Sequence, residues 1–397
     1  MHYLDHVFYW QYPYFQPRSR IGNRGWLLTY LSNGGPLYHA ALALSALHRN
    51  KVQLSRRQDY LRNQEAFEYH SRALRELCEL SRRTRTEALL DDTSQLAEFA
   101  ASSLMLISFE VFNGAEYDWL PHLEAVTTLL STLSPEVLLV HSTSPNSTET
   151  TNGNEEYAYK LFQAQPDFDF LIAHAIWFDI LSCVSTGRVP RITYRQWLEE
   201  SNLDMADLMG CYNWVMISIG DLAHLQAWKC KMKEQGTLSV PDLVMRSQEI
   251  ETRLQDGIKK LESITEENTK APQAAWVSHI FALASLILSS TIVSGPWESL
   301  PEISKNVEKA LDVLSEWPQA ISLQGLVWPL CVIGCMAEPK HQAFFESLLS
   351  NFVDECGGFG NGSTVLRIMR NCWTWQRQQG RKGMDLAFQT GVPVLLI

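Results

Sequence analysis

Apolar residues recur with a helical spacing along most of this chain, and that spacing constrains the fold more than any other feature. Leu37, Leu44 and Leu47, with alanines between them, form an apolar stripe directly after a Gly-Gly-Pro breaker. Such spacing places side chains on one face of an α-helix. Alternation with a period of two, which is typical of half-buried strands, is almost absent. The sequence therefore predicts an all-α protein, a multi-helix domain or irregular helical array with no β-sheet of consequence.

Breaker and capping residues divide the rest of the chain into further helices. We expect these helices at about residues 60–77, 94–112, 118–130, 168–187, 204–233, 239–265, 272–294, 305–317, 323–337, 341–353 and 365–379. Residues 141–156 contain no large apolar side chain and are rich in Ser, Thr, Asn and Gly, a composition typical of a flexible polar loop. We predict one domain over residues 1–397, with this loop as its only plausible internal boundary.

Charge limits the partners that the chain can bind. The 397 residues are 46% hydrophobic and carry a formal net charge of -11, and a negative protein is repelled by nucleic-acid phosphates. We therefore expect no direct DNA binding by this chain. Residues 1–90 differ from the whole chain in the sign of their charge, with thirteen Lys and Arg against seven Asp and Glu. This basic region is either the solvated face of helices or an electrostatic footprint for nucleic acid or an acidic partner.

The cysteines are typical of a reducing compartment. All eight are spread widely, mostly within apolar stretches, and no two form a Cys-x-x-Cys pair, which indicates free thiols rather than a disulfide framework. Cys331 and Cys335 lie one helical turn apart, yet a zinc site needs further ligands. We expect both to be core residues, and we predict no metal site.

One stretch is long and apolar enough to raise the question of a membrane span. Residues 271–297 contain no Asp, Glu, Lys or Arg. A stretch of this length could cross a bilayer. Several serines and a histidine dilute its hydropathy. A helix that is apolar on all sides is also expected where neighbouring helices surround it. We predict a buried helix and no membrane span.

Motifs for common chemistries are missing. The chain has no Gly-x-x-x-x-Gly-Lys-Ser/Thr loop for phosphates and no Gly-x-Ser-x-Gly elbow for a serine nucleophile. The glycines of residues 357–362 follow no strand, so we expect an ordinary loop there. Glu110 and Asp179 lie inside apolar stretches, where burial raises a carboxyl pKa, although such groups are more often paired or solvated. We predict no catalytic residue and no cofactor.

Six stretches together resemble a known family. They are MHYLDHVFYWQYPYFQP at the start, RGWLLTYLSNGGPLYHAALALSALHR (24–49), LISFEVFNGAEYDWLPHLEAV (106–126), IWFDILSCVSTGRVP (176–190), DLMGCYNWVMISIGDLAHL (207–225) and LVWPLCVIGCMA (326–337). In their order and spacing they resemble the regulatory, or middle homology, domain that follows the binuclear zinc cluster in fungal Zn2Cys6 transcription factors. The resemblance is to the branch that includes sterol-uptake regulators and regulators of secondary-metabolite clusters. The six-cysteine zinc cluster itself is not among these residues.

This resemblance implies a helical regulatory domain that acts in the nucleus, with the cytoplasm as the other location to consider. It also implies dimerisation and, in some members, binding of a small apolar effector. With no zinc cluster among these residues, we expect a zinc-cluster transcription factor to supply the contact with DNA. A homodimer is the other assembly that we consider. The thirteen Trp, thirteen Tyr and sixteen Phe could line a cavity for an apolar ligand or fill the core.

Three interpretations stay open at this point: a ligand-sensing or partner-dependent regulator of secondary metabolism or of a sterol or lipid response, a helical-pocket enzyme, and an interaction scaffold. The enzyme would fold an apolar biosynthetic intermediate and promote its cyclisation mainly by orientation. For the regulator we predict a ligand-cavity wall made by residues of 210–217 and 326–336 together with one tryptophan of the apolar stretch. The predicted wall residues are Cys211, Trp214, Met216, Trp276, Trp328, Cys331, Cys335 and Met336.

Overall fold

The computed structural model describes residues 1–17, 24–53, 59–83, 92–115, 119–133, 166–267, 273–316, 318, 321–378 and 394–397. Every regular element within these residues is a helix, and none of them belongs to a strand. The prediction of an all-α fold is therefore confirmed. The polar loop predicted at 141–156 lies outside the described residues.

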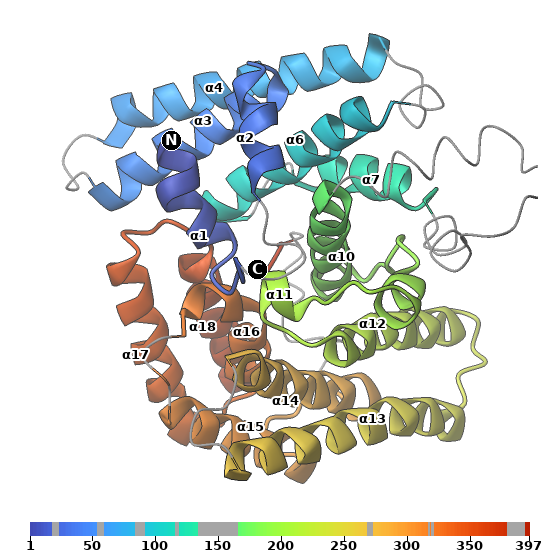
Figure 1. Cartoon of the computed structure of the whole chain (residues 1–397). Coiled ribbons are helices and arrows are strands. Elements are labelled where there is room, and N and C mark those ends of the chain that lie inside the picture. The colour runs from blue at the N-terminus through green and yellow to red at the C-terminus, as the bar shows by residue number, and fades with distance from the viewer. Residues whose placement is uncertain are drawn as a thin grey trace, which may run out of the picture.

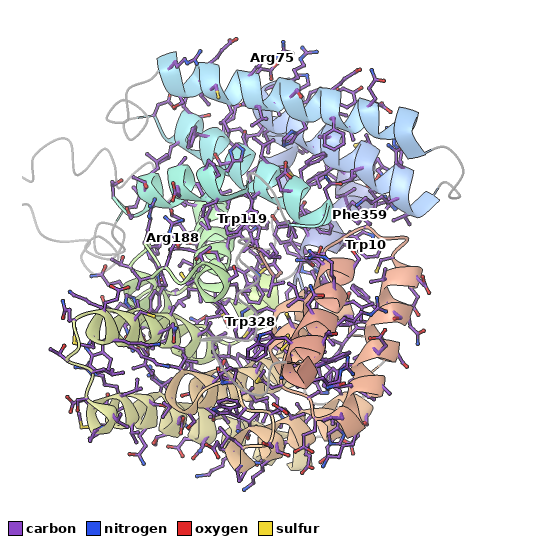
Figure 2. The ribbon with its side chains drawn as sticks, turned by 180° about the vertical axis from the view of Figure 1, so that it is seen from behind. Trp10, Arg75, Trp119, Arg188, Trp328 and Phe359 are labelled. Carbon is purple, nitrogen blue, oxygen red and sulfur yellow. The ribbon has the colours of Figure 1, made fainter. Side chains whose placement is uncertain are left out.

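The N-terminal helices form one layer, drawn in blue to cyan at the top of Figure 1. They are η1 (Tyr3–Val7), α1 (Phe8–Gln11), α2 (Gly25–Ser32), α3 (Pro36–His48), η2 (Arg49–Gln53), α4 (Asp59–Arg83), α6 (Thr93–Phe112) and α7 (Trp119–Leu130). Helix α3 is buried almost throughout because α4 and α6 pack against it. The outer face of α4 carries exposed arginines such as Arg75, at the top of Figure 2.

Helix α10 (Pro166–Thr186) connects this layer to the rest of the protein, because it packs against α6 and α7 on one side and α12 on the other. After η3 (Gln196–Glu200) and α11 (Ala206–Met209), three long helices pack against one another in sequence order. These are α12 (Asn213–Glu234), α13 (Val240–Glu267) and α14 (Gln273–Ser294). The last of them is buried over most of its length, as the apolar stretch predicts.

The C-terminal part surrounds a second buried helix. It contains α15 (Pro301–Ser315), η4 (Leu323–Leu326), α16 (Val327–Cys335), α17 (Pro339–Glu355) and α18 (Gly362–Gln378). All nine residues of α16 are buried, since α14 and α18 pack against it. Residues 394–397 then return to the centre of the molecule, where Figure 1 marks the C-terminal end.

One predicted helix is broken in the structure. Residues 204–233 were expected to form a single helix, but α11 ends at Gly210, which has a φ of +70°. This left-handed conformation is open to glycine and costly for other residues. Helix α12 begins three residues later, so residues 204–233 form two helices with a turn between them.

Three helices are long and apolar enough to cross a membrane: Ser94–Phe112, Phe168–Thr186 and Gln273–Ser294. Between 83% and 89% of each apolar window is buried inside the protein. Packing against other helices therefore accounts for their apolar character on all sides.

Candidate ligand-binding cavity

A small enclosed cavity lies where the N-terminal segment, α6, α10 and η4 meet. Its wall includes the aromatic side chains of Trp10, Tyr14, Phe112, Trp177 and Phe178. The cavity volume is about 30 Å³, far below the roughly 300–1,000 Å³ of pockets that hold drug-sized ligands. An organic ligand therefore requires the cavity to open, and none of the side chains that line it is charged.

Tyr14 fixes the N-terminal segment that lines the cavity. Its hydroxyl donates a hydrogen bond of 2.6 Å to the backbone oxygen of Ser322, and burial raises the pKa of Tyr14 well above its usual value. A Cβ at Gly210 would lie 2.5 Å from the Tyr14 ring, and one at Gly325 would overlap the same ring. Both positions therefore require glycine for the ring to lie where it does.

His174 of α10 is the one titratable imidazole in the wall. Its Nδ1 lies 2.9 Å from the Tyr12 hydroxyl, and its ring packs edge-on against Phe178 at 4.2 Å between centroids. Burial lowers the pKa of His174 to about 3, so the ring is neutral at pH 7. When the Tyr12 hydroxyl donates to Nδ1, the imidazole carries its proton on Nε2.

Two amide groups in the wall lack partners. The Nε2 atom of Gln11 and the Oε1 atom of Gln324 are buried without a hydrogen bond, although Gln11 Oε1 accepts one of 2.5 Å from the Tyr3 hydroxyl. An unsatisfied buried polar group costs about 1–3 kcal/mol. Both glutamines belong to a wall that is otherwise mainly aromatic and apolar, and an occupant could pair with these buried atoms only after the wall rearranges.

Aromatic contacts join the cavity region to both parts of the protein. Phe359, in the glycine-rich loop between α17 and α18, stacks on Phe112 at 4.5 Å and packs edge-on against Trp10 at 5.7 Å. Figure 2 shows Trp10 and Phe359 side by side where the N-terminal layer meets the C-terminal helices. The loop predicted at these glycines is confirmed, and its role here is to carry this ring.

A model of the fungal specific transcription factor domain matches residues 1–385 of the chain. The chain belongs to this family. The regulatory family predicted from the six stretches is thereby confirmed.

Named relatives of this fungal transcription factor domain regulate biosynthetic pathways. The trichothecene biosynthesis transcription regulator TRI10 of Trichoderma arundinaceum is 30% identical over 428 residues, which cover 100% of this chain and 96% of that protein. TRI10 of Fusarium sporotrichioides is 29% identical over 412 residues, with the same coverage. The ustiloxin B cluster transcription factor ustR of Aspergillus flavus is 28% identical over 402 residues, 94% of this chain and 66% of that protein. No solved structure matches the chain.

These comparisons distinguish between the interpretations drawn from the sequence. The family is a fungal transcription factor domain, and the named relatives are transcription regulators of trichothecene biosynthesis and of the ustiloxin B cluster. This domain is accordingly a transcription regulator, and it is not the cyclising enzyme that formed the alternative. Within the described residues, no group of three or more His, Cys, Asp or Glu side chains is arranged to hold a metal ion.

The eight residues predicted as a cavity wall do not line this cavity. Six of them are buried in the core, while Trp214 and Trp276 are half-buried. Trp328 is separated from the cavity wall by Phe281, because the Trp328 ring stacks on Phe281 at 5.6 Å and Phe281 packs against the lining residue Trp177 at 5.3 Å. Figure 2 places Trp328 among the packed C-terminal helices.

The other predicted wall residues lie in separate places. Cys211 follows Gly210 and borders the Tyr14 ring, whereas Trp214 packs over Gly257 in a groove between α12 and α13. Helix α16 packs against α18, where the Cys372 thiol of α18 lies 3.4 Å from the Cys335 backbone oxygen of α16. The eight residues that lie apart in this way are Cys211, Trp214, Met216, Trp276, Trp328, Cys331, Cys335 and Met336.

The sequence reasoning missed the residues that do line the cavity. Trp10 and Tyr14 come from the opening segment, whose density of aromatic residues (FYWQYPYF, residues 8–15) is the signal that could have indicated a buried role. Trp177 and Phe178 lie within α10. Apolar residues cover every face of this helix, so the sequence does not indicate which face borders a cavity.

Asp179, which the sequence places inside an apolar stretch, accepts hydrogen bonds from the backbone. Its Oδ2 atom accepts hydrogen bonds of 2.7 and 2.9 Å from the backbone N–H groups of Arg191 and Ile192. Burial raises its pKa to about 6, although these bonds and the nearby charges of Arg191 and Arg188 act in the opposite direction. The carboxyl therefore fastens α10 to the segment that follows it, which accounts for its presence in an apolar stretch.

Proposed function

We propose that this transcription regulator controls a secondary-metabolite gene cluster of the trichothecene type and senses an apolar metabolite in its central cavity. The first part is supported by the two TRI10 relatives, which align with this chain over its full length. The second part rests on one observation. The mainly aromatic wall of the cavity includes Gln11 and Gln324, each with a buried amide atom that lacks a hydrogen bond, which suits a ligand that is apolar apart from a hydrogen-bonding group and that opens the wall to reach one of them.

Sensing would act through a shift between two arrangements of the helices. The cavity wall draws residues from the N-terminal segment, α6, α10 and η4, so a ligand that opens the cavity changes how these elements pack. A ligand shifts the equilibrium only by its difference in affinity for the two arrangements. The surface that meets a partner would differ between them, which couples the ligand to transcription.

The site of action follows from the family. We propose that the chain works as one regulatory domain over residues 1–397, in the nucleus, and that a zinc-cluster transcription factor or a second copy of the chain makes up its assembly on DNA. The net charge of -11 supports this assignment, because a negative chain is repelled by DNA phosphates and a partner would have to make the contact with DNA. Of the predicted wall residues, Trp328 supports the lining residue Trp177 indirectly in this proposal, through the ring of Phe281.

Disruption of the gene in its own host tests the proposal. Cluster transcripts should fall at least tenfold and return when the wild-type gene is restored. Val111→Phe fills the cavity from α6 and should change the transcriptional response, whereas Val307→Phe is the matched control. Val111 and Val307 are both 1% exposed, but only Val111 lines the cavity. Cluster transcripts that do not change on disruption would contradict the regulatory proposal.

Overpacking either valine costs stability, so a third variant is included. Gln324→Leu removes the unpaired amide oxygen with little change in side-chain size, a replacement that is tolerated or stabilising in a core. It should leave the protein folded and weaken the response to the metabolite. An unchanged metabolite response in both Val111→Phe and Gln324→Leu would remove the cavity from the proposal.

A further inference from the structure

The last described residues of the chain fold back into the centre of the protein. Val394, Leu395 and Leu396 are 3%, 0% and 2% exposed, and Ile397 forms part of the cavity wall. We refer to residues 394–397 as the tail segment. Figure 1 shows the C-terminal end at the centre of the molecule, near α10 and α11.

Side chains of two distant helical regions hold the tail segment. Ser185 of α10 donates a hydrogen bond of 2.5 Å to the Val394 backbone oxygen. Asn361, directly before α18 and fully buried, donates one of 2.9 Å to the Leu395 backbone oxygen. The tail segment therefore joins α10 to α18 at the cavity.

We propose that the tail segment is a displaceable plug, and that an uncharged apolar ligand with a single hydrogen-bonding group competes with it for the cavity. This inference rests on the proposed function, because it names how the ligand gains entry. The cavity beside Ile397 has a volume of only about 30 Å³, so a ligand of several rings needs the space that the tail side chains occupy.

The balance of forces suits such competition. Each buried tail side chain gains by leaving water, but fixing each residue costs conformational entropy of similar size. Apart from apolar burial, the tail segment is held by the side-chain hydrogen bonds of Ser185 and Asn361. A rigid ligand pays less entropy for the same burial, and it can also satisfy Gln11 or Gln324.

The ligand class follows from the wall. None of the side chains that line the cavity is charged, and its imidazole is neutral, so an ionised ligand would find no side-chain counter-charge and would be buried at high cost. The aromatic faces suit rings. Displacement releases the contacts to Ser185 and Asn361 together, which loosens α10 from α18 and links occupancy to the packing of the two parts.

The test uses the whole chain with N-phenyl-1-naphthylamine, an uncharged aromatic amine with one N–H group, as a fluorescent probe. Hydrogen exchange followed by mass spectrometry reports the tail segment. We expect saturating probe to raise exchange of the tail amides at least tenfold. Asn361→Ala weakens the plug and should tighten probe binding about tenfold. Asn306→Ala is the control, since half-buried Asn306 donates to the Glu302 backbone oxygen within α15 and should leave binding unchanged.

Each further outcome decides a separate question. Probe binding that is blocked by Val111→Phe but leaves tail exchange and the Asn361→Ala affinity unchanged would overturn the plug and leave the ligand-sensing cavity standing. No binding to the wild type, to Asn361→Ala or to a chain shortened by residues 394–397 would overturn both. Where Asn361→Ala fails to fold, Ile397→Ala takes its place, because it removes only side-chain atoms at the cavity wall and should tighten probe binding in the same direction.

Discussion

The Tyr14 hydroxyl donates a hydrogen bond of 2.6 Å to the backbone oxygen of Ser322, across 308 residues of sequence. The ring that carries this hydroxyl lies against Gly210 and Gly325. One side chain from the opening segment therefore fixes the position of two turns that come much later in the chain. The cavity depends on this contact, because Tyr14 and Gly325 both line it.

Gly210→Ala should destabilise the protein more than Gly236→Ala does. Both glycines end a helix with a positive φ, of +70° and +67°, but a Cβ at Gly210 would lie 2.5 Å from the Tyr14 ring while Gly236 has open space. The backbone cost of about 1–2 kcal/mol is common to both, and overpacking adds about 1–3 kcal/mol at Gly210 alone. Urea unfolding measures the difference, and equal losses would contradict the packing of Tyr14 on Gly210.

The stability of the Asp179→Asn variant, measured against that of the wild type, should increase as pH rises from 4 to 7. Burial raises the folded pKa of Asp179 to about 6 from 3.8, so the unfolded chain loses its proton first. The wild type therefore loses stability between these values, by about 1.4 kcal/mol per pH unit. Asp256→Asn, at an exposed position on α13, controls for the loss of a carboxylate, and a stability gap that does not change with pH would contradict the buried, charged Asp179.

His174 should produce the opposite dependence on pH. Burial lowers its folded pKa to about 3 from 6.5, so the unfolded chain takes up a proton first as pH falls. The stability that the neutral ring contributes is present above pH 6.5 and is lost toward pH 3, by about 1.4 kcal/mol per unit.

Unfolding of the wild type and His174→Gln should be compared at several pH values between 4.5 and 7. The advantage of the wild type over this variant should shrink as the solution becomes more acidic. His6→Gln, at an exposed residue of η1, provides the control. A constant gap between the wild type and His174→Gln would show that the ring is accessible to protons.

Much of the helical framework could be predicted from the sequence. Helix α14 was expected at 272–294 and forms at Gln273–Ser294, because a long uncharged stretch between polar residues admits few other structures. Helices α15 and α17 begin earlier than expected, at Pro301 and Pro339. Proline suits the first turn of a helix, so these residues are helix starts rather than breakers.

The cavity could not be predicted in the same way. Its wall joins residues as far apart as Trp10, Trp177, Gln324 and Ile397, and helical periodicity gives only the inward face of each helix, not which faces meet. The prediction placed the wall on α12 and α16, where small and aromatic residues are mixed. The predicted residues lie elsewhere instead: Trp214 lies in the groove between α12 and α13, and Trp328 of α16 stacks on Phe281 in the core.

Native mass spectrometry of the whole chain purified from its own fungal host tests the central claim most directly. The claim is that this regulator holds an apolar metabolite in the cavity beside Tyr14. The wild type should carry a bound small molecule of the host's secondary metabolism, and the same chain with Val111→Phe should lose it while Val307→Phe keeps it. A wild-type chain without any bound molecule, purified while the host is making the cluster product, would contradict the claim.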